Sequence, residues 1–590
     1  MSNRLKGPAL DISNQIDAEK YRQKHEDFHG KVERLSKALS DSDEHADLLM
    51  NIFGNMRFLC AGRIQNAMGA DRITTAFNCF VSGTIEDSMD SIMEKASEAA
   101  ETLRRGGGVG YDFSNIRPNG YPIKSLDSDA SGPISFMGVF NAICKTISSS
   151  GHRRGAQMAV LRSDHPDIFG YVRAKRNQTE LTSFNISVGI DDKFMEALQS
   201  EDDSYDLVFE GEVYETISAR KLWDEIMESN YDWAEPGVLF LDRMNEMNNL
   251  WYCETIAATN PCAEQPLPPN GACLLGSFNL TKYLQRTKVH DKYDHYSFDF
   301  QQLKRDIPDV VRALDNVIDR TIYPLKAQED EARNKRRMGI GLTGLANAGE
   351  LLGYQYGTPE FLQWAEKVFA CIRDNCYRAS ARLAKEKGAF PLYRKEYLKS
   401  QFIRTLPASV KKEIRENGIR NSHLTSVAPT GTISLVADNV SSGIEPTFAP
   451  SYERTINTAS GTVVEEVRDY AYARGVEPKT ANELSVWEHL DVLTLASNYV
   501  DSAVSKTINV GDDVSYDDFK KIYEKAWEAG CKGATTFRLS GKRYGILNTV
   551  EETVETQEET KSKAEGITEE SGEEGTACYF DPSSGLRSCE

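Results

Sequence analysis

Several features that would assign this chain to a class of protein are missing from its sequence. No stretch approaches 18 consecutive apolar residues, so we expect no transmembrane helix. The opening residues, MSNRLKGPALDISNQ, contain no apolar secretory segment, which predicts a cytoplasmic protein. Positive charge is scarce, because 69 Lys and Arg oppose 89 Asp and Glu and leave a formal charge of −20. This balance argues against general binding of nucleic acid or of anionic membranes.

The motifs of common nucleotide and metal sites are missing as well. The glycines of RRGGGVGYD (104–112) lack GxGxxG spacing and follow a helix instead of a strand, so they predict a helix end and a tight turn. No P-loop, C-x2-C pair or HExxH helix occurs and the nine His are scattered, so we predict no metal site. The 11 Cys are expected to be buried, catalytic or metal-binding, not structural disulfides.

The chain of 590 residues is 40% hydrophobic and 27% charged, as is usual for globular proteins. Helical spacing of apolar residues covers 16–57, 88–105 and 359–388. Strand-like runs lie at 108–114, 156–162, 184–190, 238–243, 338–345, 423–429 and 533–539. Their alternation with helices predicts an α/β fold with much parallel sheet, either a barrel or an open sheet. Residues 551–575 are rich in Glu and lack aromatic residues, which predicts a solvated linker.

Reactive groups gather in TNPCAEQPLPPNGACLLGSFNL (259–280). Cys262 stands two residues from both Asn260 and Glu264. In an extended loop residues i and i+2 point the same way, so an amide, a thiol and a carboxylate could line one pocket. Two prolines discourage a helix here. Spacing alone favours this interpretation no more than a proline-rich loop with buried cysteines.

The segment APTGTIS (428–434) combines a turn with small hydroxyl residues. Its backbone N–H groups and hydroxyls could bind phosphate at the start of a helix. Ordinary helix capping explains the same residues equally well.

Six motifs in order resemble the catalytic chain of a ribonucleotide reductase. They are FNCFVSGTIEDSMDSI (77–92), NPCAEQPL (260–267), ACLLGSFNL (272–280), RRMGIGLTGLAN (336–347), RNSHLTSVAPTGTIS (420–434) and SGIEPTF (442–448). The resemblance implies a ten-stranded α/β barrel of two antiparallel five-stranded halves with a central finger loop. It divides the chain into an N-terminal helical region (1–58), the barrel (59–545), an acidic flexible linker (546–577) and a cysteine tail (578–590).

The resemblance also implies roles in the reduction of ribonucleotides to 2′-deoxyribonucleotides for DNA synthesis. Cys262 would carry a thiyl radical that abstracts the 3′-hydrogen of the ribose. Glu264 would take the 3′-hydroxyl proton and Asn260 would hold the sugar hydroxyls. Cys79 and Cys273 would deliver two reducing equivalents and end as a disulfide, so the fold must bring their Cα atoms within about 7 Å.

The resemblance assigns the remaining sites by position. Cys578 and Cys589 would form a shuttle pair that is reduced by a thioredoxin or glutaredoxin-like donor. Their ten-residue separation is wider than the family's usual spacing, and the 32-residue linker would span about 30 Å. The substrate would contact Asn78 and the loop residues Pro429, Thr430, Gly431, Thr432, Ile433 and Ser434.

An allosteric dNTP or ATP effector would bind at Asp87, Arg117 and Lys124, at the interface of a homodimer, which we favour over a monomer. Asp87 would also suit the N-cap of the following helix. Only 78 residues precede Cys79, so the resemblance implies no ATP-binding cone and no on–off switch by ATP and dATP.

The radical source depends on Thr536 and Phe537, which occupy the positions of a tyrosine pair in two-subunit metal-dependent reductases. Phenylalanine cannot carry a proton-coupled oxidation, so the chain resembles the adenosylcobalamin-dependent class. The alternative is the catalytic subunit of a metal-dependent reductase with a ferritin-like partner. A catalytically dead nucleotide-binding regulator is a third hypothesis, which the intact set of five catalytic residues opposes. Diphosphate and triphosphate substrates both stay open.

Overall fold

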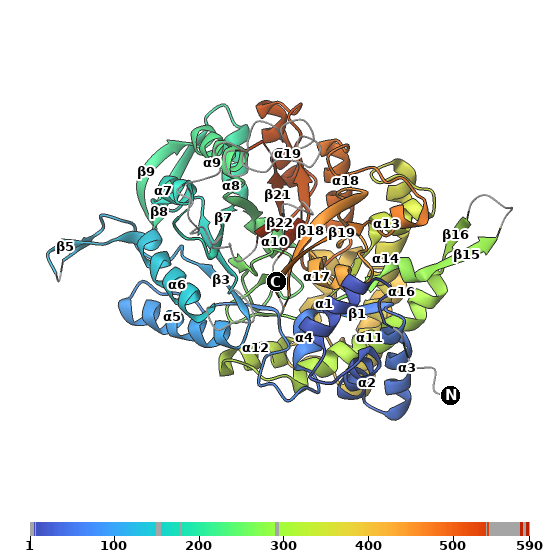
Figure 1. The fold of residues 1–590 in the computed structure, drawn as a ribbon. Helices are drawn as coiled ribbons and strands as arrows, with labels where there is room; N and C mark the ends of the chain where they lie inside the picture. The colour runs from blue at the N-terminus through green and yellow to red at the C-terminus, as the bar shows by residue number, and fades with distance from the viewer. Residues whose placement is uncertain are drawn as a thin grey trace.

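The computed structural model describes residues 5, 7–124, 126–148, 155–176, 179–288, 294–458, 461–538, 540–541, 579–581 and 586–588. Strands of the main sheets lie toward the middle of the molecule with helices around them, while several hairpins lie at its edges (Figure 1). The α/β prediction is therefore confirmed. Within these residues, no helix is both long enough and apolar enough to cross a membrane.

The larger sheet has eight strands in the order β13-β2-β3-β6-β7-β10-β21-β20. These strands are β2 (Cys79–Val81), β3 (Gly108–Asp112), β6 (Gln157–Arg162), β7 (Phe184–Ile190), β10 (Gly237–Phe240), β13 (Ala272–Cys273), β20 (Thr507–Asn509) and β21 (Gly533–Phe537). From β2 to β10 all neighbours are parallel, whereas β13 and β21 join the two ends antiparallel. Every residue of β7 is buried, as expected for a parallel strand covered on both faces.

A second sheet has the order β1-β14-β17, formed by β1 (Phe58–Cys60), β14 (Leu275–Asn279) and β17 (Gly339–Thr343). Isolated parallel bridges extend it from Ile340 to Thr425 and from Val427 to Val504. The run predicted as a strand at 423–429 is present only as these bridges. The ladders of the described residues thus form two sheets of three or more strands, beside six two-stranded ones, and a closed ring of ten strands is not seen among them.

The long helices begin at the caps that the sequence supplies. Ser88 caps α5 (Met89–Arg104), Asp299 caps α11 (Phe300–Arg320) and Thr358 caps α14 (Pro359–Lys387), each accepting a backbone N–H. The predictions for 88–105 and 359–388 are thus confirmed within one residue. Beyond the N-terminal helices, the other helices of eight or more residues are α6 (Gly132–Ser148), α8 (Asp192–Gln199), α9 (Ala219–Trp233), α12 (Lys326–Lys335), α16 (Ala408–Asn417), α18 (Val486–Ser497) and α19 (Tyr516–Glu528).

The N-terminal helices α1 (Asp11–Tyr21), α2 (Phe28–Leu39) and α3 (Asp43–Gly54) share one hydrophobic core with the second sheet. Helix α1 packs against α17 (Gly431–Val436), where the Ser13 hydroxyl donates to the Leu435 carbonyl. The Asp438 carboxylate accepts the backbone N–H groups of Ala9 and Leu10. The helical region therefore supports the segment that resembles a phosphate loop.

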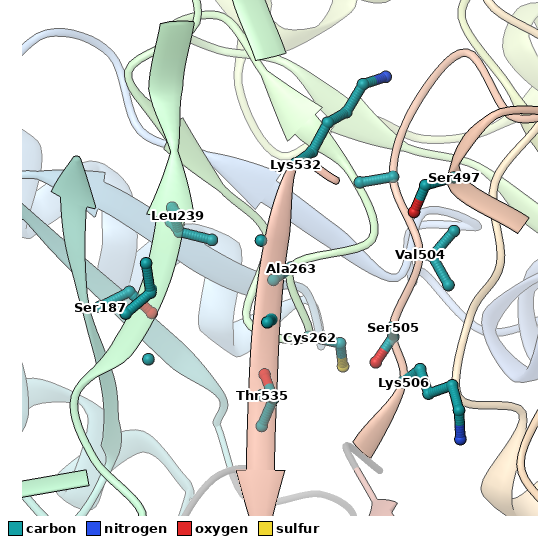
Figure 2. A pocket seen from close by; sticks show the side chains of 15 residues that line it. Ser187, Leu239, Cys262, Ala263, Ser497, Val504, Ser505, Lys506, Lys532 and Thr535 are labelled. Carbon is teal, nitrogen blue, oxygen red and sulfur yellow. The ribbon is translucent and has the colours of Figure 1, made fainter. Parts of the chain in front are cut away.

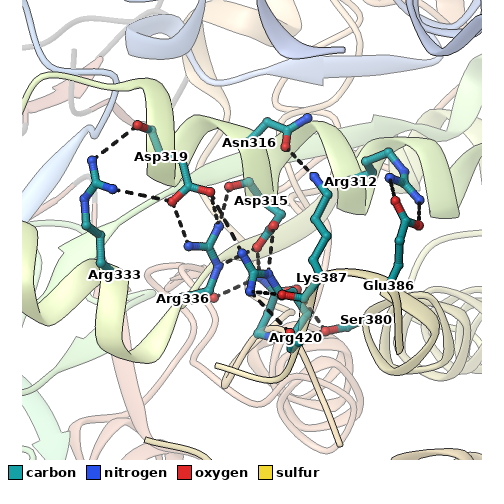
Figure 3. A network of polar contacts seen from close by, with 12 residues as sticks. Arg312, Asp315, Asn316, Asp319, Arg333, Arg336, Ser380, Glu386, Lys387 and Arg420 are labelled. Carbon is teal, nitrogen blue, oxygen red and sulfur yellow. Dashed lines mark hydrogen bonds and ion pairs between the residues drawn. The ribbon is translucent and has the colours of Figure 1, made fainter. Parts of the chain in front are cut away.

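A buried ion network explains the polar residues of two family-like motifs (Figure 3). Asp315 on α11 has no exposed surface and accepts from Arg336 at 2.8 Å, from Arg420 at 3.1 Å and from Asn421 at 2.8 Å. Asp319 adds a pair of hydrogen bonds to Arg336. Arg336, Arg420 and Asn421 therefore join the start of β17 and the segment before residue 424 to one helix, and their role is structural.

The remaining elements are short helices and hairpins. They are α4 (Gly62–Ala67), α7 (Ile168–Arg173), α10 (Leu241–Glu246), α13 (Leu345–Leu351), α15 (Gln401–Thr405), β4 (Pro122–Ile123), β5 (Ser128–Asp129), β8 (Ser204–Phe209), β9 (Glu212–Ser218), β15 (Leu284–Lys288), β16 (Asp294–Phe298), β18 (Ser451–Thr458) and β19 (Gly461–Arg468).

Candidate active site

The loop around Cys262 is a β-hairpin with a closed tip. Strands β11 (Ala258–Thr259) and β12 (Pro266–Leu267) pair antiparallel and leave six residues, NPCAEQ, at the tip. The Asn260 N–H donates to the Gln265 carbonyl at 3.1 Å, and the Gln265 N–H donates to Asn260 Oδ1 at 2.9 Å. Ala263 adopts a left-handed φ of 66°, which lets its N–H bond back to the Asn260 carbonyl. We call residues 258–267 the finger.

Glycines allow the finger to cross the two sheets. A Cβ atom at Gly110 on β3 would overlap the Thr259 carbonyl oxygen, and one at Gly108 would lie 3.1 Å from Cys79 Sγ. On β17, a Cβ at Gly339 would overlap the Gln265 amide. The tight-turn interpretation of 104–112 was therefore incomplete: Gly106 ends helix α5 as predicted, whereas Gly108 and Gly110 provide room for the finger. The GVG run at 108–110 and the GIG run at 339–341 are the sequence signal that could have indicated the close approach of the finger.

Three thiols and a carboxylate meet beside the finger. Cys79 on β2 and Cys273 on β13 are direct cross-strand partners, and all three cysteines are buried. Burial, followed by the neighbouring Glu264, Cys79 and Cys262, raises the pKa of Cys273 well above its usual value. Cys273 is therefore a thiol, not a thiolate, at neutral pH. Directly opposite residues have Cβ atoms roughly 4.5–5.5 Å apart, which is close to the separation that a disulfide needs.

Polar atoms without partners surround the same place. Among the described residues, Asn260 Nδ2, Asn78 Oδ1 and both side-chain polar atoms of Gln265 are buried with no hydrogen-bond partner. Asn260 and Gln265 have no exposed surface. Leaving a buried polar group unsatisfied costs about 1–3 kcal/mol, so such groups in a native fold call for an explanation. A polar ligand such as a sugar would provide the missing partners. Sequence reasoning selected Asn78 and Asn260 but missed Gln265.

A pocket opens beside Cys262 and Ala263 (Figure 2). Its other walls are β10, β21 and residues 503–506, and its side chains include Ser187, Leu239, Val504, Ser505 and Thr535. Two lysines at its edge already have partners. Lys506 Nζ donates to Glu445 at 2.8 Å, and Lys532 Nζ donates to the Asp501 carbonyl at 2.6 Å. Burial lowers the pKa of Lys532 to about 8.

The segment 428–434 begins a helix, as predicted. Thr430 has a left-handed φ of 58° and precedes α17. The hydroxyls of Thr343, Thr430 and Ser434 bond one another at 2.8–3.0 Å, and Thr430 also accepts the Gly443 N–H at 2.7 Å. Thr430 and Ser434, two of the predicted phosphate ligands, thus use their hydroxyls in hydrogen bonds that hold the loop in shape. The first N–H groups of a helix have no intrahelical partner, so they are the donors that the loop offers.

The predicted effector residues are partly brought together. Arg117 donates to Asp87 at 2.7 Å and stacks over the Tyr121 ring, 5.3 Å from its centre. Lys124 is exposed just after β4. The N-cap prediction for Asp87 is wrong, because Ser88 caps helix α5 and leaves the Asp87 carboxylate to Arg117.

Strand β21 contains no tyrosine. The Thr536 hydroxyl donates to Asn230 at 2.6 Å and bonds the Tyr523 hydroxyl at 2.9 Å, while Phe537 is 2% exposed. Neither Thr536 nor Phe537 has a phenol that could be oxidised. No group of three His, Cys, Asp or Glu side chains placed to hold a metal ion is found among the described residues.

The tail cysteines Cys578 and Cys589 lie outside the described residues. Between them in sequence, β22 (Tyr579–Asp581) and β23 (Leu586–Ser588) form an antiparallel hairpin that pairs Tyr579 with Ser588. Strand β23 packs against α17. The hairpin thus lies beside the segment that resembles a phosphate loop.

A thiol pair placed to close a disulfide, next to a third thiol and a carboxylate, defines an enzyme that works by cysteine redox chemistry. Residues 77–474 and 476–537 match the family described as "Ribonucleotide reductase, barrel domain". This match covers well over half of the chain, so the protein belongs to the ribonucleotide reductase family.

Individual relatives are similar over most of the chain. A Mycobacterium tuberculosis protein named vitamin B12-dependent ribonucleoside-diphosphate reductase is 35% identical over 535 residues, covering 85% of this chain and 73% of that protein. A protein of the same name from Thermoplasma acidophilum is 34% identical over 500 residues, covering 80% and 62%. The ribonucleoside-diphosphate reductase large subunit of vaccinia virus is 25% identical over 527 residues, covering 77% and 67%.

Proposed function

We propose that this protein reduces ribonucleoside diphosphates to 2′-deoxyribonucleotides with adenosylcobalamin as the radical source. The observation that carries the proposal is the cross-strand pair Cys79–Cys273 beside Cys262 and Glu264. The relatives named vitamin B12-dependent diphosphate reductases support both the cofactor and the substrate class. The absence of tyrosine from β21 disfavours the two-subunit metal-dependent alternative. A cytoplasmic location stays a prediction.

In the proposed reaction Cys262, as a thiyl radical, takes the 3′-hydrogen of the ribose and forms an S–H bond. Glu264 accepts the 3′-hydroxyl proton, and Asn260 offers its unpartnered Nδ2 to a sugar hydroxyl. Cys79 and Cys273 give two electrons and two protons and become a disulfide, while the 2′-hydroxyl leaves as water. The 3′-hydrogen then returns from Cys262, which restores the thiyl radical, and Glu264 gives its proton back to the 3′-oxygen.

The pocket beside Cys262 fits the cofactor's role. When bound, adenosylcobalamin supplies the radical that removes the hydrogen atom from the Cys262 thiol. Ser187, Gly237, Ala503 and Ser505 line the pocket together with Cys262, and their small side chains leave space for an approaching group. Lys506 and Lys532 have protein partners, so their role in this pocket is to hold its walls.

We also propose that the two sheets together form a ten-stranded barrel. Its support is the connection between the two sheets: β13 and β14 are separated by Leu274 alone, and residues 425–427 bridge β17 to the segment that leads into β20. The antiparallel pairs β2–β13 and β10–β21 would be the two junctions between the halves, so the two halves would run antiparallel to each other. The finger would then lie inside the barrel.

The remaining partners are proposals of the same kind. The start of α17 would bind the substrate phosphates, and Asp87, Arg117 and Lys124 would bind a dNTP or ATP effector. A homodimer is supported by two exposed methionines one turn apart on α5, Met89 at 57% and Met93 at 45%.

The tail would reduce the Cys79–Cys273 disulfide and exchange with a thioredoxin-like protein. The β22–β23 hairpin supports a Cys578–Cys589 pair, because it places Tyr579 opposite Ser588, the residues that follow and precede the two cysteines in sequence. This would compensate for their wide spacing in sequence.

The proposal is tested by assaying CDP and CTP reduction by the purified chain with dithiothreitol and an effector, with and without adenosylcobalamin. We expect turnover only with the cofactor, faster with CDP, and none with Cys262→Ser. Turnover that requires a ferritin-like partner and no cobalamin would establish the metal-dependent alternative. Intact effector binding without turnover under any condition would establish the third hypothesis, a catalytically dead nucleotide-binding regulator.

A further inference from the structure

Two carbonyl groups of the finger tip are held from opposite sides. The Asn185 side chain donates from Nδ2 to the Pro261 carbonyl at 3.1 Å. The Ser426 hydroxyl donates to the Glu264 carbonyl at 2.9 Å, and the Ala503 N–H donates to the same oxygen at 2.9 Å. These two carbonyls lie on either side of Cys262 along the chain. The tip is therefore tied at both flanks of the thiol.

The two side-chain donors come from different sheets. Asn185 is on β7 of the larger sheet and is 3% exposed. Ser426 is 1% exposed and lies between Thr425, which bridges Ile340 on β17, and Val427, which bridges Val504. A hydrogen bond shielded from water is held more firmly than one that water can replace. The finger tip is thus anchored to both sheets by hydrogen bonds.

The two carbonyls differ in the number of hydrogen bonds that they accept. Pro261 O receives a bond from Asn185, whereas Glu264 O receives bonds from both Ser426 and Ala503. The segment around Ala503 is fixed in turn, because Lys532 donates to the carbonyl of Asp501, whose carboxylate accepts two backbone N–H groups before Ser426. Loss of the Ser426 hydroxyl therefore leaves one donor at Glu264, while loss of the Asn185 amide leaves the Pro261 carbonyl without its bond.

We propose that Asn185 and Ser426 are positioning residues, which act through the finger to hold the Cys262 sulfur and the Glu264 carboxylate against the ribose. Hydrogen-atom transfer requires the donor and acceptor atoms in near contact, and a misplacement of about 1 Å can cost roughly 100-fold in rate. The two residues fix the backbone on which both reacting groups are mounted. Their contribution belongs to the chemical step and not to substrate affinity.

The test compares Asn185→Ala with Asn230→Ala. Asn230 is a control for the loss of a buried amide outside the finger, because it is 2% exposed, donates from Nδ2 to the Pro236 carbonyl at 2.7 Å and accepts from the hydroxyls of Thr536 and Tyr523. For each variant we would measure the melting temperature, kcat, KM and the isotope effect with 3′-deuterated substrate. We expect Asn185→Ala to lower kcat by roughly 10- to 100-fold and to raise the isotope effect, with KM nearly unchanged. Asn230→Ala should lower the melting temperature without raising the isotope effect.

The Ser426 side is tested by Ser426→Ala and the conservative Ser426→Thr, which keeps the hydroxyl. We expect a smaller loss of kcat for Ser426→Ala than for Asn185→Ala, and recovery in Ser426→Thr. The proposal is overturned if Ser426→Ala and Ser426→Thr have equal kcat and isotope effect. It is also overturned if Asn185→Ala changes kcat no more than Asn230→Ala does.

This inference rests on the proposed radical role of Cys262, and the two can fail separately. Full turnover by Cys262→Ser would overturn the radical role itself. An inactive Cys262→Ser together with normal isotope effects in Asn185→Ala and Ser426→Ala would overturn the positioning role alone.

Discussion

Gly110→Ala is the most direct test of how the finger is placed. The added Cβ would overlap the Thr259 carbonyl oxygen, well inside the 3.0 Å that real Cβ contacts respect. The Cβ position is fixed by the backbone of β3 and the oxygen belongs to the backbone of the finger, so neither atom can rotate away. One of the two segments must shift by about 1 Å, which is enough to cost roughly 100-fold in rate when the displaced segment carries the reacting thiol.

The effect on stability follows from the same overlap. Overpacking a filled interior costs about 1–3 kcal/mol, against which the lower entropy of the unfolded chain with alanine offsets about 0.4–1 kcal/mol. We therefore expect a net loss of roughly 0–2.6 kcal/mol, a modest change beside the loss of turnover.

The assay measures kcat with CDP, together with thermal unfolding, for Gly110→Ala and for Gly138→Ala. Gly138 lies within helix α6 and a Cβ there meets no atom within 4 Å. The control should keep its activity and gain up to about 1 kcal/mol of stability, because alanine favours helix. Wild-type kcat in Gly110→Ala would refute the close crossing of finger and strand.

Four further outcomes are expected. Cys273→Ser should abolish multiple turnover with dithiothreitol, checked by deoxynucleotide formed per enzyme. Asp315→Asn should lower the free energy of unfolding by about 3 kcal/mol, because the guanidinium groups of Arg336 and Arg420 lose their buried charge partner and keep only the more exposed Asp319. Glu386→Gln at a half-exposed pair should cost under about 1 kcal/mol, and urea titration measures both. Burial raises the pKa of Glu350 from 4.5 to about 8, so the stability gained by its proton is full below pH 4.5 and is lost as the pH rises through 8. Relative to the wild type, the melting temperature of Glu350→Gln should therefore rise as the pH increases from 4.5 to 8 and level off above 8, and a difference that does not change between pH 4.5 and pH 8 would contradict this. Asp87→Ala should lose its response to a dNTP effector while keeping basal turnover, as effector titrations would show.

The sequence was informative where local patterns decide structure. Continuous apolar runs predicted β3, β6, β7 and β10, because parallel strands covered on both faces bury every side chain. Helical spacing of apolar residues predicted α5 and α14, and glycine marked the end of α5. Asp87 shows the limit of such reasoning, because Ser88 is an equally good cap and only the position of Arg117 decides between them.

The site depended on contacts between distant residues. Nothing local places Cys79 opposite Cys273, which is 194 positions away; only the similarity of ordered motifs indicated it. The requirement for Gly110 depends on a carbonyl 149 positions later in the chain, and the ties from Asn185 and Ser426 depend on the path of the finger. Gln265 was overlooked because an unpartnered amide is recognised only after its surroundings are known.

The contact between the first helix and α17 has a consequence for how the protein is made. The Ser13 hydroxyl bonds a carbonyl 422 residues further along the chain. At roughly 5–20 residues per second, a ribosome needs about 20–80 s to synthesise the chain between them. Throughout that time the apolar face of helix α1 has no partner in α17, so the nascent chain exposes it to chaperones and to aggregation. The beginning of this protein can complete its fold only when most of the rest has been translated.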